Sequence, residues 1–223
     1  MNAKLALSGI SKYIMGLILV GVLLFLPAGT MHYWNGWLFI GLLFIPMLIL
    51  GTVLFVKSPE LLEKRLRSKE KENEQKQVVV ISFLMFVGGF VVSALDYRFG
   101  WSRLPIAVVV IAAIVLLVSY GLYAEVMREN AYLSRTVEVQ ENQKVIDTGL
   151  YGIVRHPMYF ATTLLFLSIP LVLGSLIGFV IFLIYPFLLV KRIKNEEQIL
   201  ENGLVGYKEY KQKVKYRLFP FIW

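Results

Sequence analysis

The chain has 223 residues, of which 57% are hydrophobic and only 17% are charged, and its formal net charge is +8. Soluble domains carry about a quarter charged residues, so this composition excludes an ordinary soluble globular protein. Because there is no cysteine, disulfides, thiolate nucleophiles and cysteine-ligated metals are also excluded. The two histidines, His32 and His156, lie far apart in the sequence, so we expect no histidine-based metal site.

Four uncharged stretches predict transmembrane helices, since about 20 mostly apolar residues cross the hydrocarbon core. They occupy 13–26 with an upstream extension, 37–56, 78–95 and 104–124. No small-residue cleavage site of the A-x-A kind follows the first stretch, so we interpret it as a span rather than a removable signal peptide. The charged segment 57–77 predicts a short interfacial helix and a solvated linker.

The stretch 158–190 is uncharged for 33 residues, which is too long for one ordinary span. Pro170 and the Gly174-Ser175 pair near its middle are typical of a turn. We therefore predict two short helices, 158–173 and 175–190, that form a tight hairpin. Each would rise about 24 Å, slightly less than a core of ~30 Å.

The basic residues predict the orientation. With four spans and a hairpin, 21 of the 23 Lys and Arg residues fall on one side, and the positive-inside rule makes that side the cytoplasm. Both termini are then cytoplasmic. Basic residues there meet anionic lipid headgroups, so we expect membrane lipids as partners and no nucleic acid.

Two polar segments flank the predicted hairpin, 143–159 and 191–220, and the hairpin brings them together. The residues expected to meet are Arg155, His156 and Tyr159 from the first segment and Arg192, Glu196 and Glu197 from the second. Arg192 and Glu196 are four residues apart, on one helix face. A helix that begins at Pro157 would point free N–H groups at the interface, where they could receive an anion.

Each of these features also has a simpler interpretation. Arg155-His156-Pro157 could be a basic membrane boundary, and Glu196-Glu197 could be a solvated helix face. Tyrosines in the tail could be interfacial anchors. The combination around an uncharged hairpin favours a ligand site, and Gly149 and Gly152 on either side of Tyr151 would allow a turn and close approach of a ligand.

These residues resemble the signature of the isoprenylcysteine carboxyl methyltransferases and related phospholipid methyltransferases. The resemblance covers about 140–220 and rests on Gly149-x-Tyr151-x-x-x-Arg155-His156-Pro157-x-Tyr159, then Arg192-x-x-x-Glu196-Glu197, Tyr207-x-x-Tyr210-x-x-x-Val214 and Arg217-x-x-Pro220. The size of the chain is closer to the short prokaryotic relatives than to the eukaryotic enzymes.

The resemblance implies S-adenosyl-L-methionine as cofactor and no metal, with the cofactor entering from the cytoplasm and a lipid-like or prenylated substrate entering from the bilayer. It implies catalytic roles for Arg192, which would orient the substrate, and for Glu196. The cofactor-binding residues that it implies are Gln143, Lys144, Val145, Ile146, Tyr151, His156, Pro157, Met158, Tyr159, Glu196 and Glu197.

The predicted fold class is therefore all-α, a polytopic integral membrane protein with four transmembrane helices, a C-terminal helical hairpin and a cytoplasmic cofactor site. We expect one membrane-embedded domain, 1–223, in which 1–140 holds the N-terminal transmembrane helices and loops and 141–223 holds the catalytic methyltransferase region.

The predicted reaction is methyl transfer to a lipid-like acceptor, with carboxyl O-methylation of an isoprenylcysteine-like substrate favoured because a carboxylate needs no general base at pH 7. An amine or hydroxyl acceptor would need a base, for which His156 or Glu197 are candidates. The alternatives are phospholipid N-methylation, a membrane reductase of the sterol type, and a channel or scaffold without enzyme activity, which the uncharged spans disfavour.

Overall fold

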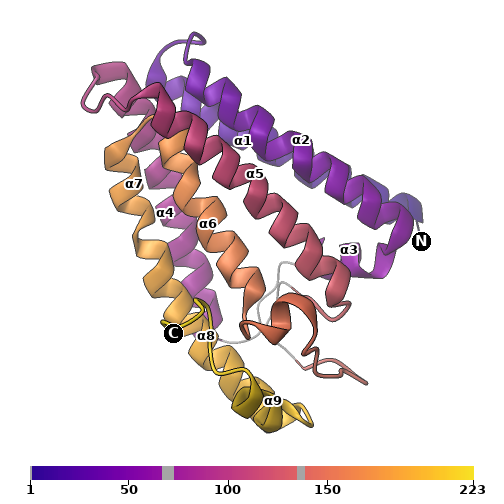
Figure 1. Ribbon diagram of the computed structural model, residues 1–223. Coiled ribbons are helices and arrows are strands. Elements are labelled where there is room, and N and C mark those ends of the chain that lie inside the picture. Colours follow the sequence, from indigo (N-terminus) through magenta and orange to yellow (C-terminus); the bar gives the residue numbers. More distant parts are fainter. Residues whose placement is uncertain (1, 67–72, 135–138) are drawn as a thin grey trace.

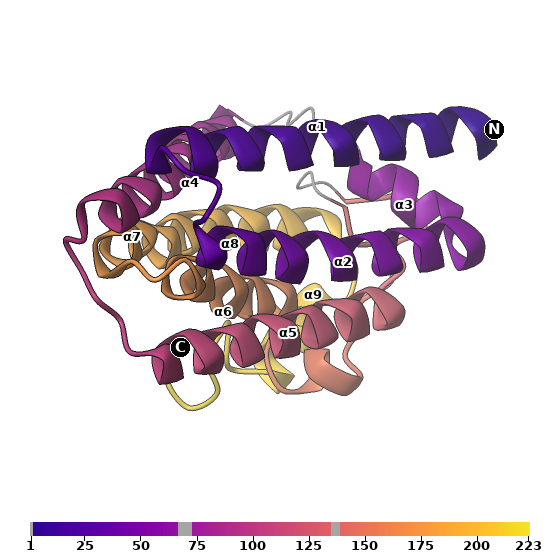
Figure 2. The same cartoon turned by 90° about the horizontal axis from the view of Figure 1, so that it is seen from above.

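The computed structural model describes residues 2–66, 73–134 and 139–223, and the described part is helical without a β-strand. The elements are α1 (Asn2–Ala28), α2 (Trp34–Lys57), α3 (Pro59–Leu66), α4 (Asn73–Phe99), α5 (Ile106–Glu129), the 3-10 turn η1 (Gly149–Gly152), α6 (Pro157–Val172), α7 (Leu176–Phe182), α8 (Ile184–Gly203) and α9 (Tyr207–Lys213). The long helices form a bundle in which α1, α2 and α5 lie as one layer over α4, α6, α7 and α8 (Figures 1 and 2).

Five helical segments of the described chain are long and apolar enough to cross a membrane. They are Ala3–Ala28, Trp34–Lys57, Lys76–Phe99, Ile106–Glu129 and Leu176–Gly203. The first four are the predicted spans, and the fifth is the second arm of the predicted hairpin. The first arm, Pro157–Val172, is apolar but shorter. The chain is thus an integral multi-pass membrane protein.

The turn between α6 and α7 has the sequence chemistry that predicted it. Gly174 has φ +79°, a left-handed conformation that glycine adopts without steric cost. Ser175 caps α7 because its Oγ accepts a hydrogen bond from Gly178 N at 2.9 Å. The predicted hairpin is therefore present, with its turn at the predicted position.

The second arm differs from the prediction in two ways. It runs to Gly203 rather than to residue 190, because the polar segment after Val190 consists mainly of good helix formers. It is also interrupted at Leu183, between α7 and α8. Pro186 explains the interruption, since a proline has no N–H for the carbonyl four residues earlier, that of Phe182.

The three turns at one end of the bundle are joined around a buried carboxylate. Asp96, at the end of α4, accepts hydrogen bonds from Ser102 N at 2.6 Å and from Ser175 Oγ at 2.5 Å, and the Ser102 hydroxyl donates to it too. The turn between α1 and α2 joins the same group, since Tyr33 Oη donates to Leu173 O at 2.7 Å and Asn35 Nδ2 donates to Val172 O at 2.7 Å. We call this end of the bundle the turn end.

The opposite end holds α3, η1 and α9 together with the charged connecting segments (Figure 1). We call it the site end. The predicted interfacial helix within 57–77 is present as α3, and the rest of that linker lies partly outside the described residues. The segregation of charge matches the pattern from which we predicted the orientation, and the assignment of the site end to the cytoplasm stays a prediction.

Candidate functional site

A cavity of about 470 Å³ opens at the site end, a size typical of small-molecule sites. It is bounded by α4, α6, α8 and α9 and by the segment that precedes η1. The predicted site residues that line it are Gln143, Lys144, Val145, Ile146, Tyr151, His156, Met158, Tyr159, Arg192 and Glu196. The hairpin therefore brings the two polar segments together as predicted.

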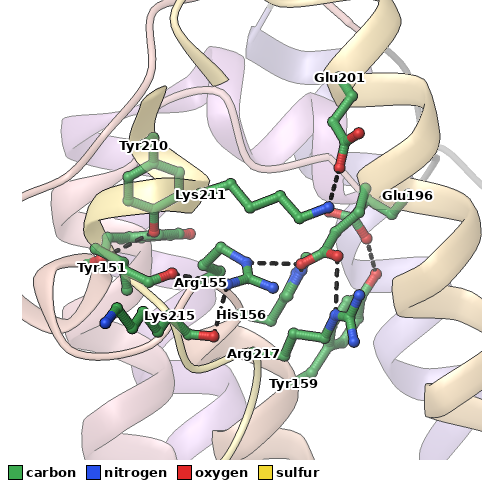
Figure 3. Close-up of polar contacts among 12 residues, drawn as sticks. Tyr151, Arg155, His156, Tyr159, Glu196, Glu201, Tyr210, Lys211, Lys215 and Arg217 are labelled. Carbon is green, nitrogen blue, oxygen red and sulfur yellow. Dashed lines mark hydrogen bonds and ion pairs between the residues drawn. The ribbon is translucent and has the colours of Figure 1, made fainter. Parts of the chain in front are cut away.

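Two predicted site residues, Pro157 and Glu197, are not among those that line this cavity. Pro157 occupies the first turn of α6, as expected, and faces a separate small cavity beside Leu218. Glu197 is only 2% exposed and accepts hydrogen bonds from Arg155 Nε at 2.7 Å and Arg217 Nε at 2.9 Å. His156 Nε2 lies 3.3 Å from the same carboxylate (Figure 3).

The C-terminal segment after α9 holds the Arg155-His156 pair in place. Arg155 N donates to Tyr216 O and His156 N donates to Arg217 O, both at 2.9 Å. The guanidinium of Arg155 also donates to the backbone oxygens of Val214 and Lys215, at 2.7 and 2.8 Å. These contacts fix His156 as a rigid part of the cavity wall, and sequence reasoning did not find them because they join segments about 60 residues apart.

Tyr159 connects the two predicted catalytic residues. Its hydroxyl donates to Glu196 Oε2 and accepts from Arg192 Nε at 2.9 Å (the contact with Glu196 is drawn in Figure 3). The His156 ring stacks on the Tyr159 ring, with centroids 5.6 Å apart. We expected Arg192 and Glu196 to act as a unit on one helix face, and the hydroxyl of Tyr159, from α6, lies between them.

Tyr151 forms a flat, buried part of the cavity wall. Asn130 Nδ2 donates to its hydroxyl at 2.9 Å, and Tyr210 Oη donates to its backbone oxygen at 2.8 Å. Burial raises the pKa of Tyr151 well above its ordinary value, so the phenol stays neutral. Gly149, which begins the η1 turn, has φ +49°, a left-handed conformation that favours glycine, and a Cβ there would displace the Glu129 carboxylate, which accepts a hydrogen bond from Leu150 N at 3.1 Å.

One side of the cavity was not predicted at all. It is lined by Val78, Val79, Ser82, Phe83 and Phe86 of α4. Nothing in the sequence distinguishes these residues from other membrane-facing positions of the same apolar span. The cavity is thus polar and charged where α6, α8 and η1 meet, and apolar along α4.

The electrostatics of the site are set by an excess of cations over its two carboxylates. Glu197 is enclosed by two guanidinium groups and His156, while Glu196, the next residue, lines the cavity. Adjacent helical positions differ by about 100°, so the two side chains serve different surfaces. Within the described ranges, no group of three or more His, Asp or Glu side chains could hold a metal ion.

The family match to known proteins falls on the part of the chain that holds most of this site. Residues 107–202 match the model of the isoprenylcysteine carboxyl methyltransferase (ICMT) family. The fold is similar to the solved structure of the eukaryotic intramembrane Ras methyltransferase ICMT, with a TM-score of 0.59 and 18% sequence identity over 96% of this chain and 77% of that chain.

A curated relative carries another activity in its name. The chain is 30% identical over 91 residues to Delta(14)-sterol reductase TM7SF2 of Mus musculus, a match that covers 40% of this chain and 22% of the relative. The chain thus matches about a fifth of that relative's length. The resemblance to the isoprenylcysteine carboxyl methyltransferase family that the sequence predicted is confirmed, because residues 107–202 match the model of that family and the fold is similar to that of the solved ICMT.

Proposed function

We propose that this protein is an integral membrane methyltransferase that uses S-adenosyl-L-methionine and acts on a lipid-like acceptor from the bilayer. The favoured reaction is carboxyl O-methylation of an isoprenylcysteine-like substrate. The observation that carries this proposal is the two-sided cavity, in which Arg192 and Glu196 share one space with apolar residues of α4 such as Phe83. A charged cofactor and an apolar acceptor need such a space in order to meet.

The residues around the polar part fit the cofactor by their chemistry. Tyr151 offers a flat wall, Gln143 offers an amide, and His156 and Glu196 offer ring nitrogen and carboxylate partners. The segment Gln143–Ile146 would hold the cofactor from the η1 side, with Met158 and Tyr159 from α6. When bound, S-adenosyl-L-methionine supplies a methyl group that its sulfonium already activates.

The protein's own task is then to position the acceptor. Arg192 can hold an acidic group through its planar fork, and Tyr159 and Glu196 restrict where that fork points. A tight bidentate pair would also stabilise the nucleophile before reaction, so partial neutralisation of Arg192 by Glu196 favours turnover. A carboxylate acceptor is ionised at pH 7 and needs no general base.

The apolar residues of α4 would exclude water from the reacting groups. Phe83 and Phe86 line the cavity on the side of the predicted bilayer core. Removal of water strengthens electrostatic interactions in the cavity. We infer that an acceptor with a long apolar chain lies along α4 while its polar end reaches Arg192.

The test is incubation of purified protein with methyl-labelled S-adenosyl-L-methionine and three acceptor classes, namely prenylated thiols with a free carboxylate, fatty acids and phosphatidylethanolamine. We expect label only in the prenylated carboxylate. Label in phosphatidylethanolamine would replace O-methylation by phospholipid N-methylation. Absence of label from every acceptor, by a protein that does not bind the cofactor, would overturn the proposal.

The location of the cofactor is tested by three alanine variants, His156→Ala, Glu196→Ala and Tyr151→Ala. Each should weaken binding of S-adenosyl-L-methionine in calorimetry while expression and extraction in detergent stay largely intact. Normal binding by all three would place the cofactor elsewhere.

The match to a sterol reductase supports a second candidate, a reductase that uses a nicotinamide cofactor. One measurement of cofactor binding distinguishes the two candidates. Binding of a reduced nicotinamide dinucleotide without binding of S-adenosyl-L-methionine would favour the reductase.

A further inference from the structure

Tyr207 has a buried hydroxyl whose role the arrangement of the protein does not explain. The residue begins α9, is 4% exposed and lines the cavity. Among the described residues, its hydroxyl has no hydrogen-bond partner. Buried hydroxyl groups are nearly always bonded, because an unsatisfied one loses its hydration without compensation.

The other tyrosines of the cavity wall have partners for their hydroxyls. Tyr132 donates to Asn142 O at 3.2 Å, Tyr185 donates to Thr162 Oγ1 at 3.0 Å, and Tyr210 donates to Tyr151 O at 2.8 Å. The hydroxyls of Tyr151 and Tyr159 are bonded as described above. Within the described part of the wall, Tyr207 therefore stands apart as a lining residue whose buried hydroxyl has no partner.

The surroundings of Tyr207 indicate which kind of partner it takes. Burial, together with the charges of Glu197 and Glu196, raises the pKa of its phenol far above the ordinary value, so the group keeps its proton and can donate. The same two carboxylates disfavour an anionic acceptor nearby, although Arg155 partly offsets them. A neutral oxygen or an unprotonated ring nitrogen fits these conditions.

Tyr207 also lies beside the segment that we assigned to the cofactor. Its ring belongs to a small apolar cluster with Leu204, Tyr210 and Val214, against which Val145 packs. The ring centroid of Tyr210 is 5.7 Å from that of Tyr207. Packing thus fixes the ring in the wall of the cavity, beside the segment that holds Val145.

We propose that the Tyr207 hydroxyl is a further cofactor-binding group, which donates a hydrogen bond to a neutral acceptor on the adenosine part of the cofactor, a ribose oxygen or an adenine ring nitrogen. This inference rests on the proposed function and adds a recognition residue to it. Tyr207 contributes affinity and orientation and takes no part in the chemical step.

The variant Tyr207→Phe tests the proposal because it removes only the hydroxyl. Calorimetry with S-adenosylhomocysteine, and with 5′-methylthioadenosine, which lacks the amino-acid part, should give dissociation constants raised by roughly threefold to tenfold, the range of one hydrogen bond. Since the hydroxyl has no partner in the free protein, the melting temperature without ligand should stay the same or rise.

A matched control is Tyr120→Phe. Tyr120 lies in α5, does not line the cavity, and donates from its hydroxyl to Leu43 O at 2.8 Å. This variant should lower the melting temperature of the free protein and leave both dissociation constants unchanged. Tyr207→Phe should therefore weaken ligand binding without loss of stability, and Tyr120→Phe should lower stability without a change in ligand binding.

The possible results separate this inference from the proposed function. If the wild-type protein binds neither adenosine compound, the proposed function fails and the role of Tyr207 fails with it. If the wild-type protein binds and Tyr207→Phe binds equally well, the role of Tyr207 is wrong and the proposed function stands. A loss seen with S-adenosylhomocysteine but not with 5′-methylthioadenosine would overturn the assignment to adenosine. A marked loss of stability in free Tyr207→Phe would mean that the hydroxyl has a protein partner, which also overturns it.

Discussion

The two ends of the bundle each bury one carboxylate, and they satisfy it in different ways. At the turn end, Asp96 is 1% exposed and accepts hydrogen bonds from Ser102 and Ser175, which are uncharged. At the site end, Glu197 is 2% exposed and is enclosed by the cations Arg155 and Arg217 and by a histidine. The first arrangement joins three turns, and the second joins the C-terminal segment to the wall of a cavity.

The difference shows how a buried ion cluster can hold the wall of a ligand cavity in place. The hydrogen bonds of Asp96 with Ser102 and Ser175 close one end of the bundle around the hairpin turn. The Glu197 cluster holds Arg155 and His156 in place, while the neighbouring Glu196 remains at the cavity surface. A charged group that faces a ligand must keep its position without direct burial, and a buried ion cluster behind it can supply that rigidity.

The largest expected contrast between the two ends is accessibility from the two sides of the membrane. Exposed positions suited to labelling are Gln212 at the site end and His32 at the turn end, and the native chain has no cysteine that would also be labelled. In sealed vesicles of known orientation, a membrane-impermeant thiol reagent should label Gln212→Cys only from the cytoplasmic side and His32→Cys only from the opposite side. Labelling of Gln212→Cys only from outside would overturn the predicted orientation.

The next largest effect should follow from Glu197→Gln. The substitution keeps the shape of the side chain but leaves Arg155 buried beside Arg217 without a carboxylate. Removal of one partner of a buried ion pair costs about 3–5 kcal/mol, so the free energy of unfolding should fall by that amount. Denaturant unfolding in a fixed detergent measures it.

The matched substitution at the other end is Asp96→Asn. It disturbs hydrogen bonds from neutral donors only, so the loss should be smaller, about 1–3 kcal/mol. Cofactor affinity should be unchanged in Asp96→Asn, because the turn end does not border the cavity. Equal losses in the two variants would remove the distinction between an ion cluster and a set of neutral hydrogen bonds.

A smaller effect, on turnover rather than on folding, is expected for Arg192→Lys. Lysine is a point charge on a flexible stem and cannot reproduce the fork that Tyr159 and Glu196 restrict. Cofactor affinity should stay the same, and turnover should fall roughly tenfold to a hundredfold if the acceptor is misplaced. Both quantities are measured on the same purified protein.

Controls for Arg192→Lys are Lys191→Ala and Lys194→Ala, whose side chains are exposed on the same helix. They should retain nearly full turnover. If all three variants show equal and mild effects, Arg192 is one of several basic residues near the membrane surface and does not orient the acceptor.

Much of the fold could be predicted because its signals are local. The spans follow from uncharged stretches, and the hairpin follows from Pro170 and Gly174-Ser175. The approach of Arg155 and His156 to Glu197 followed from topology alone, since a hairpin returns the chain to its starting side. The length of α8 was underestimated because we ended the helix where hydrophobicity ends, although helix formers continue to Gly203.

The details of the site could not be predicted because they depend on contacts between distant segments. No periodic pattern indicates that the backbone of 214–217 pairs with Arg155 and His156. The hairpin topology predicted that Tyr159 lies near Arg192 and Glu196, but the position of its hydroxyl between them depends on how α6 and α8 pack. The contribution of α4 to the cavity was missed because Phe83 and Phe86 look like lipid-facing residues.

The smallest expected effect concerns an ion pair on the surface of the site end, Asp147 with Lys213 at 2.7 Å. Both side chains are largely exposed, so water and salt screen the pair, and Asp147→Asn should change the melting temperature at pH 7 by little more than the scatter between repeats. The hydrogen bond from Lys213 lowers the pKa of Asp147, so any stabilisation is present above the ordinary pKa of the carboxyl group and is lost as the pH falls through the lowered one. The difference in melting temperature between wild type and Asp147→Asn should therefore shrink further in melts recorded at pH 3.

Asp147 and Glu197 are both carboxylates bonded to cations, and they differ in burial. A loss in Asp147→Asn as large as that in Glu197→Gln would mean that burial does not decide the strength of these pairs, which would contradict the comparison of the two ends.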